Sequence, residues 1–136
     1  MERRKFITAT ALAVAAGGLT TAFANNTVKT NKKGAIYNHY LLFWLKPELS
    51  AKEVEDFTGF FEILKGLPYV KSIQWGKPAN STPRKVVDNS FTYNLVIQFA
   101  SLEDLEAYGK LPVHLAAIKK YSVFWDRMIV HDSILR

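Results

Sequence analysis

The amino-acid sequence predicts an α+β domain with a ferredoxin-like βαββαβ order, in which helices lie on one face of an antiparallel sheet. Three observations lead to this fold class. Apolar and polar residues alternate over residues 90–99, which is typical of a strand. Ser50 and Ser101 each precede apolar residues at helical spacing, and each has an acidic residue three positions later. Further strand-like segments flank these helices, so the order is strand, helix, two strands, helical segment and strand.

The first 24 residues predict a signal peptide. Arg3 and Arg4 precede an apolar stretch, residues 11–23, that is too short for a stable membrane anchor. This stretch leads into Ala-Phe-Ala at residues 22–24, where small side chains favour cleavage. The Arg3-Arg4 pair resembles a twin-arginine export motif, from which Glu2 departs, and the general export route is the alternative. We therefore expect a bacterial protein that is periplasmic or secreted and keeps no stable membrane anchor after cleavage.

Residues 25–34 are polar and predict a flexible linker, so the folded domain is expected at residues 35–136. The first strand is expected at residues 37–46, and Pro47 ends it. Alternate residues of this strand form two largely apolar faces, so both faces are expected to be covered. The two faces consist of Tyr37, His39, Leu41, Phe43 and Leu45, and of Asn38, Tyr40, Leu42 and Trp44.

A helix is expected from Ser50 to Gly66. Ser50 is its N-cap, and Glu53 completes a capping box. An apolar stripe at helical spacing would face the sheet, and it consists of Val54, Phe57, Phe61 and Leu64. Gly66 is expected to end the helix in the left-handed conformation, after which Pro68 prevents its continuation.

The second half of the domain predicts three more strands and two helical segments. They are a strand at 70–76, a loop at 77–89, a strand at 90–99, a helix from Ser101 to Gly109, a helical segment from Pro112 to Tyr121 and a strand at 128–135. The sheet face without helices is expected to be rich in Phe, Leu and Tyr. Such a face is unfavourable in water, so two copies are expected to pack face to face as a homodimeric α/β barrel.

The composition excludes several classes of function. The chain has 136 residues, is 49% hydrophobic and carries a net charge of +6. Its Lys and Arg residues are scattered without interleaved aromatics, so we expect the charge to aid solubility and not to bind nucleic acid. The absence of cysteine excludes disulfides, thiolate metal sites and a cysteine nucleophile. The three histidines have no metal-ligand spacing, so no metal site is predicted.

Tyr108, His114 and His39 are the candidates for chemistry. If Pro112 begins a helix, His114 lies near the positive end of the helix dipole, which lowers its pKa and favours the neutral ring of a general base. Tyr108 lies six residues earlier, across a helix break, and can donate to a developing oxyanion. The two histidines also have structural interpretations. His39 can be a core histidine held by one hydrogen bond, and His114 can be a polar surface residue near a turn. His131 is interpreted as an edge or dimer contact.

Several motifs resemble the stress-responsive A/B barrel (Dabb) family. They are HYLLFWLK at residues 39–46, VKSIQWG at residues 70–76, the strand at 91–99 followed by SLEDLEAY, and Pro-Val-His at residues 112–114. The resemblance covers residues 37–135. It implies a dimeric α+β barrel with a pocket on the inner face of each sheet.

One plant member of the family is a polyketide cyclase that closes a ring by aldol condensation without a cofactor. The resemblance implies that Tyr108 and His114 carry proton transfers and that His39 lines the pocket. This chain departs from the family pattern at two positions. Leu111 stands where a His is frequent, and Tyr93 stands where the cyclase has a pocket His. The resemblance therefore supports the site more than the reaction.

Three functions remain open from the sequence. The first is a cofactor-independent isomerase, cyclase or lyase. The second is a non-catalytic protein that binds a small apolar or aromatic ligand. The third is a structural stress-response dimer in which the barrel is filled by Phe43, Phe91, Leu95 and Ile97. The site residues are Tyr108 and His114 as catalytic, and His39, Tyr93, Phe43 and Phe91 as substrate-binding. No cofactor is predicted, since no motif supports haem ligation by a histidine.

Overall fold

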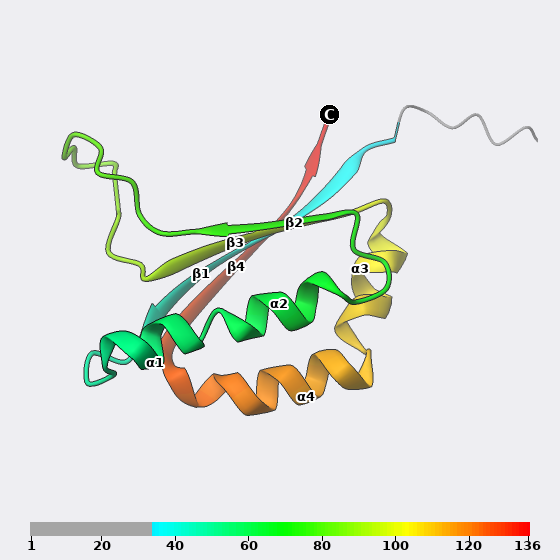
Figure 1. Cartoon of the computed structure of the whole chain (residues 1–136). Helices are drawn as coiled ribbons and strands as arrows, with labels where there is room; N and C mark the ends of the chain where they lie inside the picture. The colour runs from blue at the N-terminus through cyan, green and yellow to red at the C-terminus, as the bar shows by residue number, and fades with distance from the viewer. Residues whose placement is uncertain (1–33) are drawn as a thin grey trace, which may run out of the picture. The chain divides into compact units, whose positions relative to one another are not determined.

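The computed structural model describes residues 34–136 (Figure 1). The predicted signal peptide at residues 1–24, and all but the last residue of the predicted linker at residues 25–34, lie outside the described residues. The elements are β1 (Ile36–Leu45), α1 (Ala51–Asp56), α2 (Gly59–Lys65), β2 (Ser72–Gly76), β3 (Tyr93–Phe99), α3 (Leu102–Gly109), α4 (Pro112–Tyr121), the 3-10 turn η1 (Ser122–Phe124) and β4 (Trp125–Leu135). This order confirms the predicted βαββαβ fold.

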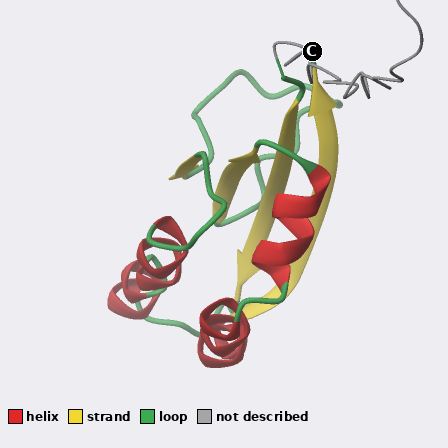
Figure 2. Cartoon of the chain, turned by 90° about the vertical axis from the view of Figure 1, so that its right-hand side faces the viewer, coloured by secondary structure: helices red, strands yellow, loops and turns green. Residues whose placement is uncertain are grey.

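The four strands form one antiparallel sheet with the order β2-β3-β1-β4. Strand β1 is central and pairs with both β3 and β4, while β2 and β4 form the edges. Figures 1 and 2 show α1, α2 and α4 on the same side of this sheet. None of the helices within residues 34–136 combines the length and the apolar character needed to cross a membrane.

The helices cover the more aromatic face of the sheet. The buried strand residues on this face are Leu41, Phe43, Leu45, Tyr93, Leu95, Ile97 and Phe99. The opposite, open face is mixed and half-buried, and includes Asn38, Tyr40, Leu42, Trp44, Asn94, Val96 and Gln98. The interpretation that Phe43, Phe91, Leu95 and Ile97 fill a dimer barrel on the uncovered face is therefore wrong for Phe43, Leu95 and Ile97, and Phe91 precedes β3. Because side chains alternate along a strand, only one face carries the phenylalanines, and the helices bury it.

The expected helix from Ser50 to Gly66 is divided into α1 and α2. Its predicted start is confirmed, because Ser50 and Glu53 form a complete capping box. The break follows Phe57, where the Thr58 hydroxyl donates to the Glu55 carbonyl at 2.7 Å. A hydroxyl that bonds its own turn competes with helix propagation, and the glycine that follows is a weak helix former. Phe57, which follows α1, and Phe60 and Phe61 of α2 are nevertheless buried in the core.

The conformation predicted for Gly66 is wrong. Gly66 has a φ of −85°, in the right-handed region, and the positive φ of this segment belongs to Tyr69 at 73°. Hydrogen bonds between residues three positions apart end α2 instead. The Gly66 amide donates to the Ile63 carbonyl at 3.2 Å, and the Leu67 amide donates to the Leu64 carbonyl at 3.1 Å. Such bonds satisfy terminal carbonyls without a left-handed residue.

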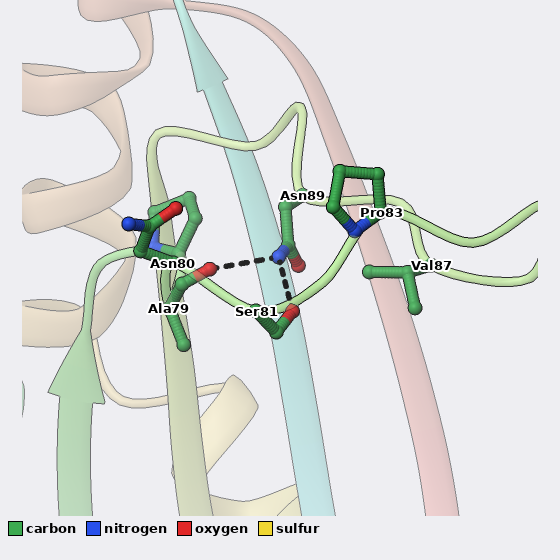
Figure 3. Close-up of a pocket in the computed structure, with 7 residues that line it drawn as sticks. Ala79, Asn80, Ser81, Pro83, Val87 and Asn89 are labelled. Carbon is green, nitrogen blue, oxygen red and sulfur yellow. Dashed lines mark hydrogen bonds between the residues drawn. The ribbon is translucent and has the colours of Figure 1, made fainter.

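The long loop between β2 and β3 encloses a shallow cavity of about 400 Å³ (Figure 3). The Asn89 amide nitrogen donates to the Ala79 carbonyl at 2.9 Å and to the Ser81 hydroxyl at 3.2 Å. These bonds hold the two sides of the loop together. None of the side chains that line this cavity is titratable, so the cavity itself offers no group for acid–base chemistry.

Candidate active site

A second cavity, of about 210 Å³, lies between the sheet and the helices. Its wall is formed by residues from β1, α2, α3, α4 and β4, which are His39, Leu41, Phe60, Leu64, Tyr108, His114, Ile118, Trp125, Met128 and Val130. Seven of these side chains are apolar. The other three are the two histidines and the tyrosine that the sequence singled out for chemistry. A small apolar chamber with a few convergent polar groups is the usual form of a ligand site.

Tyr108 enters this cavity from the end of α3. The helix starts as predicted, because the Ser101 hydroxyl accepts the Asp104 amide at 3.0 Å. The Tyr108 residue is only 2% exposed, and its ring packs 5.0 Å from the ring of Phe99. Burial alone raises the pKa of its phenol, with no contribution from a hydrogen bond to another described residue. The hydroxyl therefore stays protonated at neutral pH and can donate a hydrogen bond to a ligand.

His114 is the third residue of α4, which begins at Pro112 as predicted. Its ring centroid lies 4.3 Å from that of Tyr108. The Nδ1 atom lies 3.2 Å from the Gly109 carbonyl oxygen, to which it donates. In the neutral ring, that bond places the proton on Nδ1 and leaves Nε2 as an acceptor. This is the form in which a histidine acts as a general base.

The pKa of His114 is lowered, in the direction expected from the sequence. Burial of the ring is the largest cause, a positive charge on nearby His39 adds to it, and the bond to the Gly109 carbonyl opposes it. The sequence attributed the lowering to the helix dipole, whereas desolvation dominates here. A half-buried imidazole loses part of the water that would stabilise its charged form.

His39 reaches the cavity from β1 and is held by a residue that sequence analysis missed. Its Nδ1 atom donates to the Asp132 carboxylate at 2.5 Å. Asp132 lies directly opposite His39 in the pairing of β1 with β4. The His39 side chain is 16% exposed and that of Asp132 is 54% exposed, so the carboxylate sits at the rim. Strand register brings the pair together, and no local motif marks it.

The structure places the other candidates away from the cavity. Phe43 is fully buried among the aromatic residues of the core. Tyr93 is also buried, and its hydroxyl donates to the Val54 carbonyl at 3.2 Å. Phe91 precedes β3, and none of these three is among the lining residues. His131 faces the open side of the sheet opposite Tyr40. The sequence did not reveal the apolar lining of the cavity, because its residues come from four elements that are far apart along the chain.

The lowered pKa of His114 predicts a pH-dependent stability. In the unfolded chain the imidazole binds a proton near its ordinary pKa of 6.5, whereas the half-buried ring of the folded chain binds it only at lower pH. The unfolded state therefore takes up more protons as the pH falls below 6.5, and the free energy of unfolding decreases. Urea unfolding between pH 5 and 8 measures this. His114→Gln should weaken the dependence, and an unchanged slope in this variant would contradict the assignment.

Comparison with known proteins shows which family the domain around this site resembles. The model of the Stress responsive A/B Barrel Domain (Dabb) family matches residues 37–135. Among characterised proteins, the chain is similar to the olivetolic acid cyclase of Cannabis sativa. The two are 24% identical over 95 residues, which cover 69% of this chain and 91% of the cyclase.

Solved structures show the same fold at low sequence identity. Hydroxynitrile lyase from Passiflora edulis superposes with a TM-score of 0.63 at 21% identity, covering 74% of this chain and 94% of the lyase. A dimeric protein with a ferredoxin-like fold from Bacteroides fragilis superposes with a TM-score of 0.60 at 22% identity, covering 74% and 96%. At such identities the likeness establishes the fold alone.

Proposed function

The chain belongs to the stress responsive A/B barrel (Dabb) family, and on that premise we propose that it is a cofactor-independent enzyme that removes a proton from the carbon next to a carbonyl group. One observation carries the proposal: the rings of Tyr108 and His114 lie 4.3 Å apart, centroid to centroid, and both line one apolar cavity. The first is a protonated donor and the second a neutral acceptor. A site for enolate formation needs both groups.

The chemistry follows from the two protonation states. The Nε2 atom of His114 accepts the proton from the α-carbon, and the electron pair of the broken C–H bond forms the enolate double bond. Negative charge then develops on the carbonyl oxygen, where the Tyr108 hydroxyl donates a hydrogen bond. The apolar wall strengthens that bond, since the local dielectric constant is low. Return of the proton from His114 to another position completes an isomerisation. Attack of the enolate carbon on a second carbonyl breaks that C=O π bond, and the resulting alkoxide takes the proton back from His114, which completes a cyclisation.

Two relatives support a catalytic role of the fold. One bears the name of a cyclase and the other that of a lyase. The reactions in these names differ, so they favour an enzyme without naming its reaction. The alternative is a protein that binds a small apolar ligand without turnover, which the seven apolar side chains of the cavity also suit.

Assembly and location complete the proposal. We infer that two copies pack through their open sheet faces, because that face is half-buried and mixed, and because a structural relative is dimeric. Sedimentation velocity on the mature chain would test this. The basic and apolar residues at 1–24 support export to the bacterial periplasm or beyond, which N-terminal sequencing of the secreted form would test.

Exchange of α-protons with solvent deuterium tests the reaction class, since it requires only the first proton transfer. We expect the wild-type protein to accelerate the exchange of simple ketones such as 2-heptanone in D₂O at pH 7, followed by ¹H NMR. Tyr108→Phe should lose most of the acceleration, and Tyr69→Phe, at an exposed loop position, should not. Equal rates with wild type, Tyr108→Phe and buffer would support the non-catalytic alternative.

Asp132 is expected to act as a positioning residue through His39. Its carboxylate accepts the Nδ1 proton of His39 and so leaves Nε2 free to face a ligand. Asp132→Ala should reduce exchange by up to about 10²-fold, because the His39 ring would no longer be held in its position relative to the substrate. The ¹⁵N shifts of His39 should show that Nδ1 is no longer the only protonated nitrogen. Asp132→Asn keeps an acceptor and should restore the ring state, and no change in either variant would exclude the role.

A further inference from the structure

We infer that this cavity selects an uncharged ketone or aldehyde with a compact apolar body slightly larger than a benzene ring, and that it excludes carboxylates and phosphorylated substrates of the same size. The inference deepens the proposed function by naming its substrate class. It is carried by the charges around the cavity, the volume of the cavity and the position of the mouth.

The charges around the cavity disfavour an anion. The ten lining residues include no Lys or Arg. The lining residue His39 pairs with the carboxylate of Asp132, which is negative. Even if His39 is protonated, this pair is neutral as a whole. A carboxylate ligand would therefore lose its water without gaining a cationic partner, which is strongly unfavourable.

Two cations that lie on neighbouring elements pack against aromatic rings outside the cavity lining. The guanidinium of Arg127 on β4 packs 4.3 Å above the ring of Trp44, on the open face of the sheet. The ammonium of Lys120 at the end of α4 lies 5.1 Å from the ring of Tyr121. Neither residue lines the cavity. Neither Arg127 nor Lys120 therefore supplies a positive charge to a ligand in the cavity.

The volume limits the size of the ligand. An apolar cavity of about 150 Å³ accommodates benzene, and this one has about 210 Å³. Tyr108 and His114 come from α3 and α4, whereas Phe60 and Trp125 come from α2 and β4, so we expect a ligand with one carbonyl to bind the first pair while its body contacts the second. The space holds a few more non-hydrogen atoms than benzene. It does not hold a long acyl chain.

The mouth of the cavity lies along edge strand β4. Met128 and Val130 line the cavity and are each 39% exposed, whereas Leu41 and Leu64 in the wall are buried. A substitution at Met128 can therefore change the charge at the entrance without burying the new group. Val123, which is 61% exposed on η1 and does not line the cavity, offers a matched control.

Binding of three size-matched methyl ketones tests the charge selection. The probes are 2-heptanone, the carboxylate levulinate, and its neutral ester methyl levulinate. In ¹⁵N NMR spectra, 2-heptanone and methyl levulinate should shift the indole signal of Trp125 and leave that of Trp44, on the open face, unchanged. Levulinate should bind at least about a hundredfold more weakly. Equal affinity for levulinate and its ester would overturn the inference.

A cation placed at the mouth should reverse the selection. Met128→Lys is expected to raise the affinity for levulinate about tenfold or more, and Val123→Lys should leave it unchanged. The size limit has its own test, since 2-undecanone should bind no more tightly than 2-heptanone despite its greater hydrophobicity. Tighter binding of the longer ketone would refute the limit.

These measurements separate the substrate class from the reaction. If 2-heptanone binds at Trp125 but its exchange is not accelerated, the proposed catalysis is contradicted and the selection stands. If exchange is accelerated equally for 2-heptanone and levulinate, the reaction stands and the selection is contradicted. If 2-heptanone neither binds nor exchanges, both are contradicted.

Discussion

Replacing His114 by alanine is expected to reduce the acceleration of ketone α-proton exchange by about 10²- to 10⁴-fold, the range typical of a lost general base. The reason is the ring's protonation state, since burial keeps it neutral and the bond to Gly109 leaves Nε2 unprotonated. Tyr108 remains in His114→Ala, so the donor to the enolate oxygen is preserved. The measurement is the exchange rate at pH 7 in D₂O, compared with buffer.

The same substitution at His131 is the matched control. His131 lies on β4 and faces the open side of the sheet, away from the cavity. His131→Ala should keep the exchange rate of the wild type within about twofold, as expected for a group outside the reaction. If both substitutions reduce exchange equally, the loss reflects stability or assembly and His114 is not the base.

Replacing Phe57 by alanine is expected to lower the free energy of unfolding by about 3–5 kcal/mol, the usual cost of deleting a buried aromatic ring. Phe57 is fully buried at the break between α1 and α2. Its ring lies within 6.1 Å of seven other aromatic rings, which are those of Phe43, Phe60, Phe61, Tyr93, Tyr121, Phe124 and Trp125. The surroundings are expected to relax only partly into the cavity left behind, because Phe57 packs between the sheet and the helices.

Urea unfolding followed by circular dichroism measures this loss. Leu102→Ala is the control, because Leu102 is 48% exposed at the start of α3 and its truncation should change stability by less than about 0.5 kcal/mol. A loss below about 1 kcal/mol for Phe57→Ala would show that the core can repack around the gap. Phe60 and Trp125 contact both Phe57 and the cavity, so ligand binding should weaken in the same variant.

The order of the elements was predictable because it rests on local chemistry. A serine followed three residues later by an acidic residue satisfies the free amides of a helix start, and Ser50 and Ser101 do so here. A proline suits the first turn, where Pro112 begins α4. Alternation along β1 and β3 separated the two faces of the sheet. The candidates Tyr108 and His114 followed from their positions relative to these helix boundaries.

Local patterns failed where competing contacts decide the outcome. The break after Phe57 depends on a side-chain bond of Thr58, and the end of α2 uses tight turns in place of a left-handed Gly66. Both faces of β1 looked apolar, so the sequence did not show which one the helices would cover. Helices bury the face that gains most from leaving water, and that is the face with Phe43.

The sequence by itself determined the fold class, the capped helix starts and the residue types able to carry proton transfer. Only the tertiary structure decided that His39, Tyr108 and His114 share one cavity, that Asp132 holds His39, and that Phe43 and Tyr93 belong to the core. The physical reason is the separation along the chain over which each interaction acts. Caps, turns and alternation act within a few residues, whereas His39 and Asp132 are 93 positions apart and meet only through the register of β1 and β4.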